Sequence, residues 1–130
     1  KERDVPCLIY QGRLNMLDRA PQQEGILDLC QQEGVGFISF SPLAQGLLTD
    51  RYLNGIPEGS RMTRGKFLKE EMLTPQLLEQ LRQWNSEAQQ QGMTLAEKAL
   101  RWILEQKGVT SVLIGASSTG QLDRNLKCVR

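Results

Sequence analysis

Histidine is absent from this chain of 130 residues, which removes the side chain that most often serves as a general acid or base near neutral pH. Aromatic residues are scarce, at 5%, and neither charge dominates, with 16 basic and 15 acidic residues. A nucleic-acid-binding protein shows clustered basic residues with interleaved aromatics, so we expect no nucleic-acid partner. Because the apolar runs are far shorter than the about 20 residues that cross a bilayer, and the first residues are charged, we expect neither a membrane span nor a secretory leader.

Cysteine is also rare. Cys7, Cys30 and Cys128 are odd in number and widely spaced, and they form no Cys-x-x-Cys pair. This usage predicts reduced, buried thiols in a cytoplasmic protein. The paired acids Glu70 and Glu71 read as a solvated helix face, so we expect neither a metal site nor a catalytic constellation within the chain.

Short apolar segments alternate with segments of helical periodicity. Because the expected strands lack polar alternation, they predict a parallel sheet that is covered on both sides or closed into a barrel. Three strands leave bare edges and cannot close, so we expect part of a larger α/β fold that pairs with its missing strands or with a second copy. The expected strands are residues 5–10, 37–41 and 109–114; the expected helices are 23–32, one from Thr74 to Gly92, one from Thr94 to Gly108 and a short one that ends near 127, with a long irregular segment at 42–73.

A turn of small residues, 41–46, follows the second expected strand. Small residues let backbone amides approach an anion closely, as a phosphate site requires. On spacing alone, an ordinary strand exit that stops at Pro42 accounts for this turn better than a phosphate site. A core position likewise accounts for Phe40 better than stacking on a flat ligand ring.

A second turn of small residues, 115–118, follows the third expected strand and opens onto a helix. Amides at the start of that helix, with Gln121 and Arg124 one turn on, predict an anion pocket. A simple helix cap by Ser117 or Ser118 is an equally good interpretation. If both strands belong to one parallel sheet, the two turns leave it at the same rim.

Residues 40–52 read FSPLAQGLLTDRY and are followed by Gly-Ile-Pro at 55–57; together they resemble the seventh-strand segment of the aldo-keto reductases. Residues 109–125 look like that family's eighth strand and phosphate-binding helix, and Gln11 with Asn15 and Arg19 resembles its sixth-strand motif. The likeness covers nearly the whole chain and is greatest to the branch with bacterial glyceraldehyde-3-phosphate-type reductases and the beta subunits of voltage-gated potassium channels. It implies that residues 1–130 form one domain, an incomplete (β/α)8 TIM barrel of strands six to eight, with no second domain.

The resemblance also implies a site for NADPH, extended across the carboxyl ends of the barrel strands. Gln11 is then expected to hold the nicotinamide carboxamide, and Phe40 to stack on the nicotinamide ring. Arg124 stands where the family usually has an acid and is expected to attract a phosphate. The pyrophosphate is expected to meet Ser41, Pro42, Leu43, Ala44, Gln45, Gly46, Arg51 and Arg61, and the adenosine 2′-phosphate and adenine to meet Gly115, Ser117, Gln121 and Asn125.

The function that the resemblance implies is NADPH-dependent reduction of aldehydes or ketones, with a small-molecule carbonyl substrate bound by the complete enzyme. The family's catalytic Asp, Tyr, Lys and His have no counterparts in this sequence. We therefore expect the chain to supply much of the cofactor site and to be inactive alone. Two alternatives remain: a non-catalytic nucleotide-binding regulatory protein that resembles the channel beta subunits, and an inactive truncated remnant.

Overall fold

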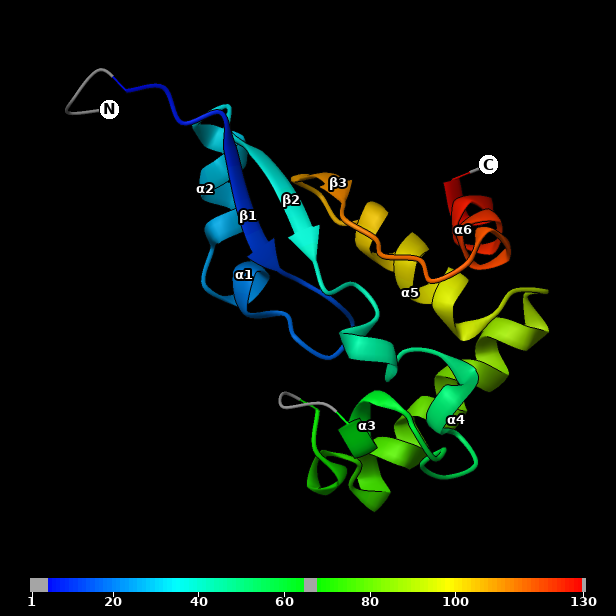
Figure 1. Cartoon of the computed structure of the whole chain (residues 1–130). Helices are drawn as coiled ribbons and strands as arrows, with labels where there is room; N and C mark the ends of the chain where they lie inside the picture. Colours follow the sequence, from blue (N-terminus) through cyan, green and yellow to red (C-terminus); the bar gives the residue numbers. More distant parts are fainter. Residues whose placement is uncertain (1–4, 65–67, 130) are drawn as a thin grey trace.

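A computed structural model describes residues 5–64 and 68–129 of the chain. At its centre is a parallel sheet of β1 (Ile9–Arg13), β2 (Gly36–Phe40) and β3 (Val109–Val112), which lie in this order (Figure 1). Gln11 lies opposite Ile38 in the register of β1 and β2, and the pairing of β2 with β3 shifts after Phe37. Because the strands are parallel, the turns that follow them leave from the same edge of the sheet.

Helices connect the strands, and two of them begin at the caps that the sequence predicts. Thr74 Oγ1 accepts a hydrogen bond from Leu77 N at 3.1 Å. Thr94 and Glu97 form a capping box, in which Glu97 N donates to Thr94 Oγ1 at 3.2 Å and Thr94 N donates to Glu97 Oε2 at 2.7 Å. The helices are α1 (Ala20–Gln23), α2 (Ile26–Gln32), α3 (Arg61–Arg64), α4 (Pro75–Gln90), α5 (Leu95–Leu104) and α6 (Thr119–Leu126), and the short 3₁₀ turns are η1 (Ala44–Gly46), η2 (Asp50–Tyr52), η3 (Glu70–Met72) and η4 (Lys127–Val129).

Two expected boundaries are wrong because the backbone turns left-handed there. The helix expected at 23–32 begins only at Ile26, after the separate short helix α1 that ends at Gln23, since Gly25 between them has a φ of 74°. The strand expected at 37–41 ends at Phe40, since Ser41 has a φ of 52° and leaves the extended conformation.

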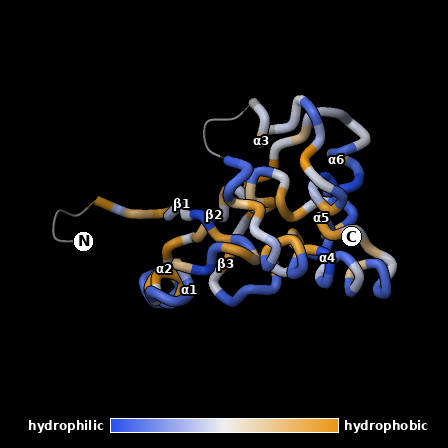
Figure 2. The backbone as a smooth tube through the Cα atoms, turned by 90° about the horizontal axis from the view of Figure 1, so that it is seen from below, coloured by the Kyte–Doolittle hydropathy of each residue, from blue (hydrophilic) through white to orange (hydrophobic). Residues whose placement is uncertain are grey.

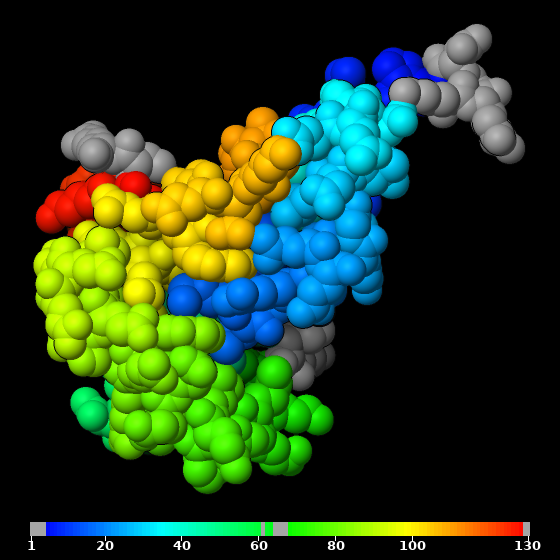
Figure 3. Space-filling model, turned by 180° about the vertical axis from the view of Figure 1, so that it is seen from behind, coloured from blue at the N-terminus to red at the C-terminus, as the bar shows by residue number. Residues whose placement is uncertain are grey.

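The sheet is covered by helices on one face only within the described chain. Phe37 and Ser39 point to the covered face and are fully buried, whereas their neighbours Ile38 and Phe40 are half-buried. From behind (Figure 3), α5 adjoins the segment of α1 and α2 across this face, and Gln22 Nε2 donates to Gln106 Oε1 at 2.6 Å between them. A sheet covered on both sides is therefore not what these residues form. The core between sheet and helices contains Leu14, Leu27, Cys30, Phe37 and Ile103.

The strand expected at 5–10 is displaced and exposed. β1 begins only at Ile9, and Val5, Leu8 and Ile9 are 67%, 73% and 58% exposed. Figure 2 shows this hydrophobic segment extending away from the rest of the molecule. β1 is an edge strand of the described sheet, so its apolar side chains have neighbours on one side only.

The segment expected to be irregular, 42–73, has a core of its own. It contains η1, η2, α3 and η3, and its side chains gather around the fully buried Tyr52. Leu48 and Leu53 from the same segment pack against α4 and α5. The segment, at the bottom of Figure 1, therefore packs against the rest of the molecule and joins the sheet to the helices α4 and α5. The residues buried with Tyr52 are Leu47, Met62 and Leu68.

The three thiols differ in environment, and none is in a disulfide. Cys30 is buried as expected, but Cys7 is exposed, because it precedes the edge strand β1. Cys128 is half-buried, and its Sγ donates to Asn125 O at 2.9 Å. Burial raises the pKa of the Cys128 thiol, which lowers its thiolate fraction at neutral pH.

Thiol labelling should follow this order. With a maleimide at pH 7, we expect Cys7 to react first, Cys128 more slowly and Cys30 only on unfolding. Because the thiolate is the reacting species, the rate at Cys128 should rise as the pH is increased toward its raised pKa. Peptide mapping by mass spectrometry over time measures all three rates, and rapid labelling of Cys30 in the folded chain would contradict the packing described above.

Candidate functional site

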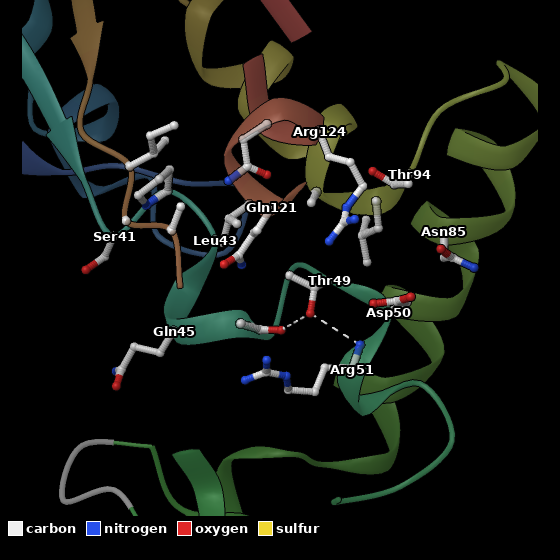
Figure 4. Close-up of a pocket in the computed structure, with 18 of the residues that line it drawn as sticks. Ser41, Leu43, Gln45, Thr49, Asp50, Arg51, Asn85, Thr94, Gln121 and Arg124 are labelled. Carbon is white, nitrogen blue, oxygen red and sulfur yellow. Dashed lines mark hydrogen bonds between the residues drawn. The ribbon is translucent and has the colours of Figure 1, made fainter. Parts of the chain in front are cut away.

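A cavity of about 1700 Å³ opens at the carboxyl edge of the sheet (Figure 4). One wall is formed by the turns that follow β2 and β3, and the opposite wall by η2 and α4. In parallel α/β structures this edge is where ligands bind, because the loops there vary freely above a fixed scaffold. From the sheet and turns, the lining residues are Gln11, Phe40, Ser41, Pro42, Leu43, Gln45, Gly46, Leu113, Ile114, Gly115, Ala116 and Ser117.

The turn 41–46 is held in an unusual backbone conformation. Ser41, Ala44 and Gln45 have φ values of 52°, 45° and 59°, in the left-handed region that side-chain-bearing residues disfavour. Ser41 O accepts from Ala44 N at 3.0 Å, and Leu43 O accepts from Gly46 N at 2.8 Å. Strain of this kind persists only where the surroundings impose it, and such positions cluster at functional sites.

Two buried polar side chains tie this turn and its strand to the segment after β1. Ser39 Oγ donates to Leu14 O at 2.8 Å, and Asn15 Nδ2 donates to Ser41 O at 3.0 Å. Ser39 is 0% exposed and Asn15 1% exposed. The sequence analysis named Asn15 only as part of the sixth-strand motif and predicted neither contact, although a polar residue between the apolar Leu14 and Met16 is a signal of a buried hydrogen-bonding role.

A second link positions a cation at the cavity. Thr49 Oγ1 donates to Gly46 O at 2.6 Å and accepts from Arg51 N at 3.2 Å, as the dashed lines in Figure 4 show. This cap starts η2 directly after the turn 41–46 and places Arg51 on the lining. Arg51 is exposed and forms no ion pair with any residue that the structure describes.

The start of α6 completes the wall that is formed by the turns after β2 and β3. Ser118 caps the helix by accepting from Gln121 N at 3.2 Å, so the capping interpretation is confirmed for Ser118. Ser117 makes two hydrogen bonds to Gln121 Oε1, from its N at 2.7 Å and from its Oγ at 2.9 Å. Arg124 extends from α6 into the cavity in Figure 4. Asn125 lines the cavity at 5% exposure, and its Nδ2 has no partner among the described residues.

The structure brings together nearly all the residues that the sequence singled out. All of them line this one cavity except Ala44 and Arg61. Ala44 instead packs against the core clusters that contain Leu48 and Tyr52. The Arg61 side chain lies outside what the structure describes. The cofactor roles given to these residues remain predictions.

Apart from Arg51, the residues of the opposite wall were not foreseen. They are mostly polar positions on η2, α4 and the start of α5, which the fold of segment 42–73 carries back toward the sheet. Arg82 on this wall donates from Nε and Nη2 to Leu53 O, at 3.1 and 3.0 Å, and so fixes α4 to the end of η2. The residues of this wall are Thr49, Asp50, Leu53, Asn54, Arg82, Asn85, Ser86, Gln89, Met93, Thr94, Leu95 and Ala96.

Two further properties concern the described part of the chain only. Its cysteine, aspartate and glutamate side chains do not gather in groups of three or more that could hold a metal ion. None of its helices combines the length and the apolar character needed to cross a bilayer.

A parallel sheet with a ligand-sized cavity at the carboxyl ends of its strands places this chain among the α/β proteins of barrel or doubly wound type. Comparison with known families narrows this class. The model of the aldo/keto reductase family matches residues 1–130. The chain belongs to the aldo/keto reductase family, and its resemblance to that family is confirmed.

Relatives with known names agree with this placement. Proteins named L-glyceraldehyde 3-phosphate reductase, from Escherichia coli O157:H7 and from strain K12, are each 48% identical over 98% and 99% of this chain. A Schizosaccharomyces pombe protein, provisionally named a voltage-gated potassium channel subunit beta, is 38% identical over 92% of it. The chain spans 38% of the length of the two bacterial relatives and 36% of the third.

The fold also has a counterpart among solved structures. The crystal structure of a thermostable aldo-keto reductase with the inhibitor epalrestat superimposes with a TM-score of 0.65 over 97% of this chain and 35% of its own. The two sequences are 24% identical, so this match bears on the fold alone. It supports an α/β unit that corresponds to part of a (β/α)8 barrel.

Proposed function

We propose that this chain forms the NADPH-binding part of an aldo/keto reductase that reduces an aldehyde or ketone to an alcohol. The observation that carries the proposal is the meeting of the turns 41–46 and 115–118 at one cavity, with Arg51 and Arg124 beside them. A dinucleotide phosphate needs backbone amides, hydroxyls and cations along an extended surface. We assign β1, β2 and β3 to strands six, seven and eight of a complete (β/α)8 barrel.

The residues at the cavity fit such a cofactor. Asn125 Nδ2 is a buried donor without a described partner, and it suits an adenine nitrogen acceptor. Arg51 and Arg124 are exposed guanidinium groups that can bind phosphates bidentately. Gln11 and Phe40, at the sheet end of the cavity, would meet the nicotinamide carboxamide and ring.

The phosphates divide between the two turns in this proposal. The pyrophosphate lies along residues 41–46 and Arg51, with Arg61 as a further contact. The adenosine 2′-phosphate lies against Gly115, Ser117 and Gln121, at the start of α6, where the helix dipole favours negative charge. This extra phosphate is what distinguishes NADPH from NADH.

When bound, NADPH supplies a hydride to the carbonyl carbon of the substrate. The carbonyl oxygen also needs a proton, and among the residues lining the described cavity neither histidine nor tyrosine is present to donate one. We assign the donor to polypeptide beyond this sequence, as the family resemblance implies, so the chain alone binds cofactor without turning substrate over. Because the two bacterial relatives are named for glyceraldehyde 3-phosphate, a phosphorylated aldehyde is the first substrate to test.

The uncovered part of the sheet exposes surface that another polypeptide segment would cover. The accessible surface is 8748 Å², whereas a compact monomer of 14.7 kDa exposes about 6900 Å². Open parallel edges and exposed Ile9 and Leu113 account for part of the excess. We propose that further barrel strands, or a second copy of the chain, cover them. The free thiols suit a cytoplasmic location.

Cofactor titration of the purified chain tests the proposal. We expect saturable quenching of tryptophan fluorescence by NADPH, and no oxidation of NADPH when glyceraldehyde 3-phosphate is added. Arg51→Ala should weaken binding about tenfold, because it removes a charge-assisted phosphate contact. The matched control Arg101→Ala changes an exposed arginine on α5 that is not part of the cavity and should bind as the unmodified chain does. No binding at all would contradict the cofactor assignment, and turnover would contradict the assigned inactivity.

A further inference from the structure

We propose that Asn15 is a positioning residue that holds the turn 41–46 in the shape that receives the pyrophosphate. This inference rests on the proposed function. Asn15 is 1% exposed and is not part of the cavity lining, so it acts through the backbone of Ser41 and not on the cofactor itself.

Both polar atoms of the Asn15 side chain make hydrogen bonds, and these bonds reach two different loops. Its Oδ1 accepts from Leu17 N and Asp18 N, both at 2.9 Å, and these bonds close the turn that follows β1. Its Nδ2 donates to Ser41 O at 3.0 Å, across 26 residues of sequence. One amide therefore sets the position of one loop relative to the other.

The bond to Ser41 acts where the backbone is strained. Ser41 has a φ of 52°, and the same carbonyl oxygen also accepts from Ala44 N. Without the Asn15 donor, only that local hydrogen bond holds the carbonyl direction, and Ser41 can relax toward an extended conformation. The amides and side chains of residues 41–46 would then leave their positions on the cavity wall.

The decisive variant is Asn15→Asp. It keeps the size and both acceptor bonds, but it places a carboxylate oxygen against Ser41 O in place of a donor. Asn15→Ser is the second variant, because its short hydroxyl cannot span the distance to Ser41. The matched control is Ser39→Ala, which removes the buried hydrogen bond to Leu14 O between the same two segments and leaves Ser41 held.

Binding of two probes to the full chain separates positioning from loss of structure. NADPH touches the turn 41–46, whereas adenosine 2′-monophosphate carries only the part assigned to the start of α6. For Asn15→Asp we expect about tenfold weaker NADPH binding, unchanged binding of adenosine 2′-monophosphate, and faster hydrogen exchange at Ala44 N. For Ser39→Ala we expect NADPH binding within about twofold of the original, despite lower stability.

The outcomes distinguish this inference from the proposed function. Unchanged NADPH binding in both Asn15 variants, or an equal loss in Ser39→Ala, would overturn the role of Asn15 and leave the cofactor site standing. If the original chain bound neither probe, the proposed function would fail instead. In that case unchanged exchange at Ala44 N in Asn15→Asp would also overturn the claim that Asn15 holds the turn.

Discussion

Phe37→Ala is expected to lower the free energy of unfolding by about 3–5 kcal/mol. Phe37 is fully buried on the covered face of the sheet and packs with Leu27 and Ile103 from the helices behind it. Its ring also stacks on Tyr10, with 5.7 Å between the ring centroids, so the substitution leaves a cavity that spans β1 and β2. Urea unfolding followed by far-ultraviolet circular dichroism measures the loss.

Phe40→Ala is the matched comparison for this prediction. It removes the same side chain from the same strand, but from the uncovered face, where Phe40 is half-buried and lines the cavity. Because less area returns to water, we expect a cost of only about 1 kcal/mol, together with weaker NADPH binding. Equal destabilisation by the two substitutions would show that the face of the sheet bearing Phe40 is covered as well.

Arg124→Glu is expected to reduce the affinity for NADPH roughly 30-fold and to leave NADH binding nearly unchanged. Arg124 extends from α6 into the cavity beside Gln121, where the 2′-phosphate is assigned. Reversing its charge replaces an attraction to that phosphate by a repulsion, and NADH carries no phosphate at this position. Calorimetric titration with the two cofactors measures the ratio.

The control for Arg124→Glu is Lys127→Glu. Lys127 is an exposed cation three residues further along, and it is not part of the cavity lining, so this variant makes a similar charge change away from the assigned phosphate. If Lys127→Glu lowered the preference for NADPH as much as Arg124→Glu does, the effect would come from the overall charge around α6 and not from a contact of Arg124 with the phosphate. Equal losses of NADPH and NADH binding in Arg124→Glu would place the arginine at the pyrophosphate instead.

The sequence predicted those features that depend on residues close together in the chain, such as helix caps and turns. Thr74 and Thr94 cap their helices as expected, because side-chain caps depend on residues within one turn. The turns 41–46 and 115–118 were located because small residues and proline interrupt apolar strands, and the parallel arrangement brings them to one rim. The motif resemblance then indicated the family, which the comparisons confirm.

Features that depend on distant residues were not predictable in the same way. The apolar segment 5–10 predicted a buried strand, but burial requires a neighbour that the described chain does not provide at that edge. The wall that contains Asn85 faces the turns only because segment 42–73 folds onto α4. The contact of Asn15 with Ser41 likewise depends on the pairing of β1 with β2, and no local sequence pattern predicts which strands pair.

The one-sided sheet has a consequence for how stability varies with temperature. Unfolding a chain raises its heat capacity in proportion to the apolar surface that water newly reaches. Here Val5, Leu8 and Ile9 are already hydrated in the folded state. The heat-capacity increment is therefore smaller than the about 1.6–2.0 kcal/mol/K typical of 130 residues, and the stability curve is correspondingly flat between cold and warm conditions.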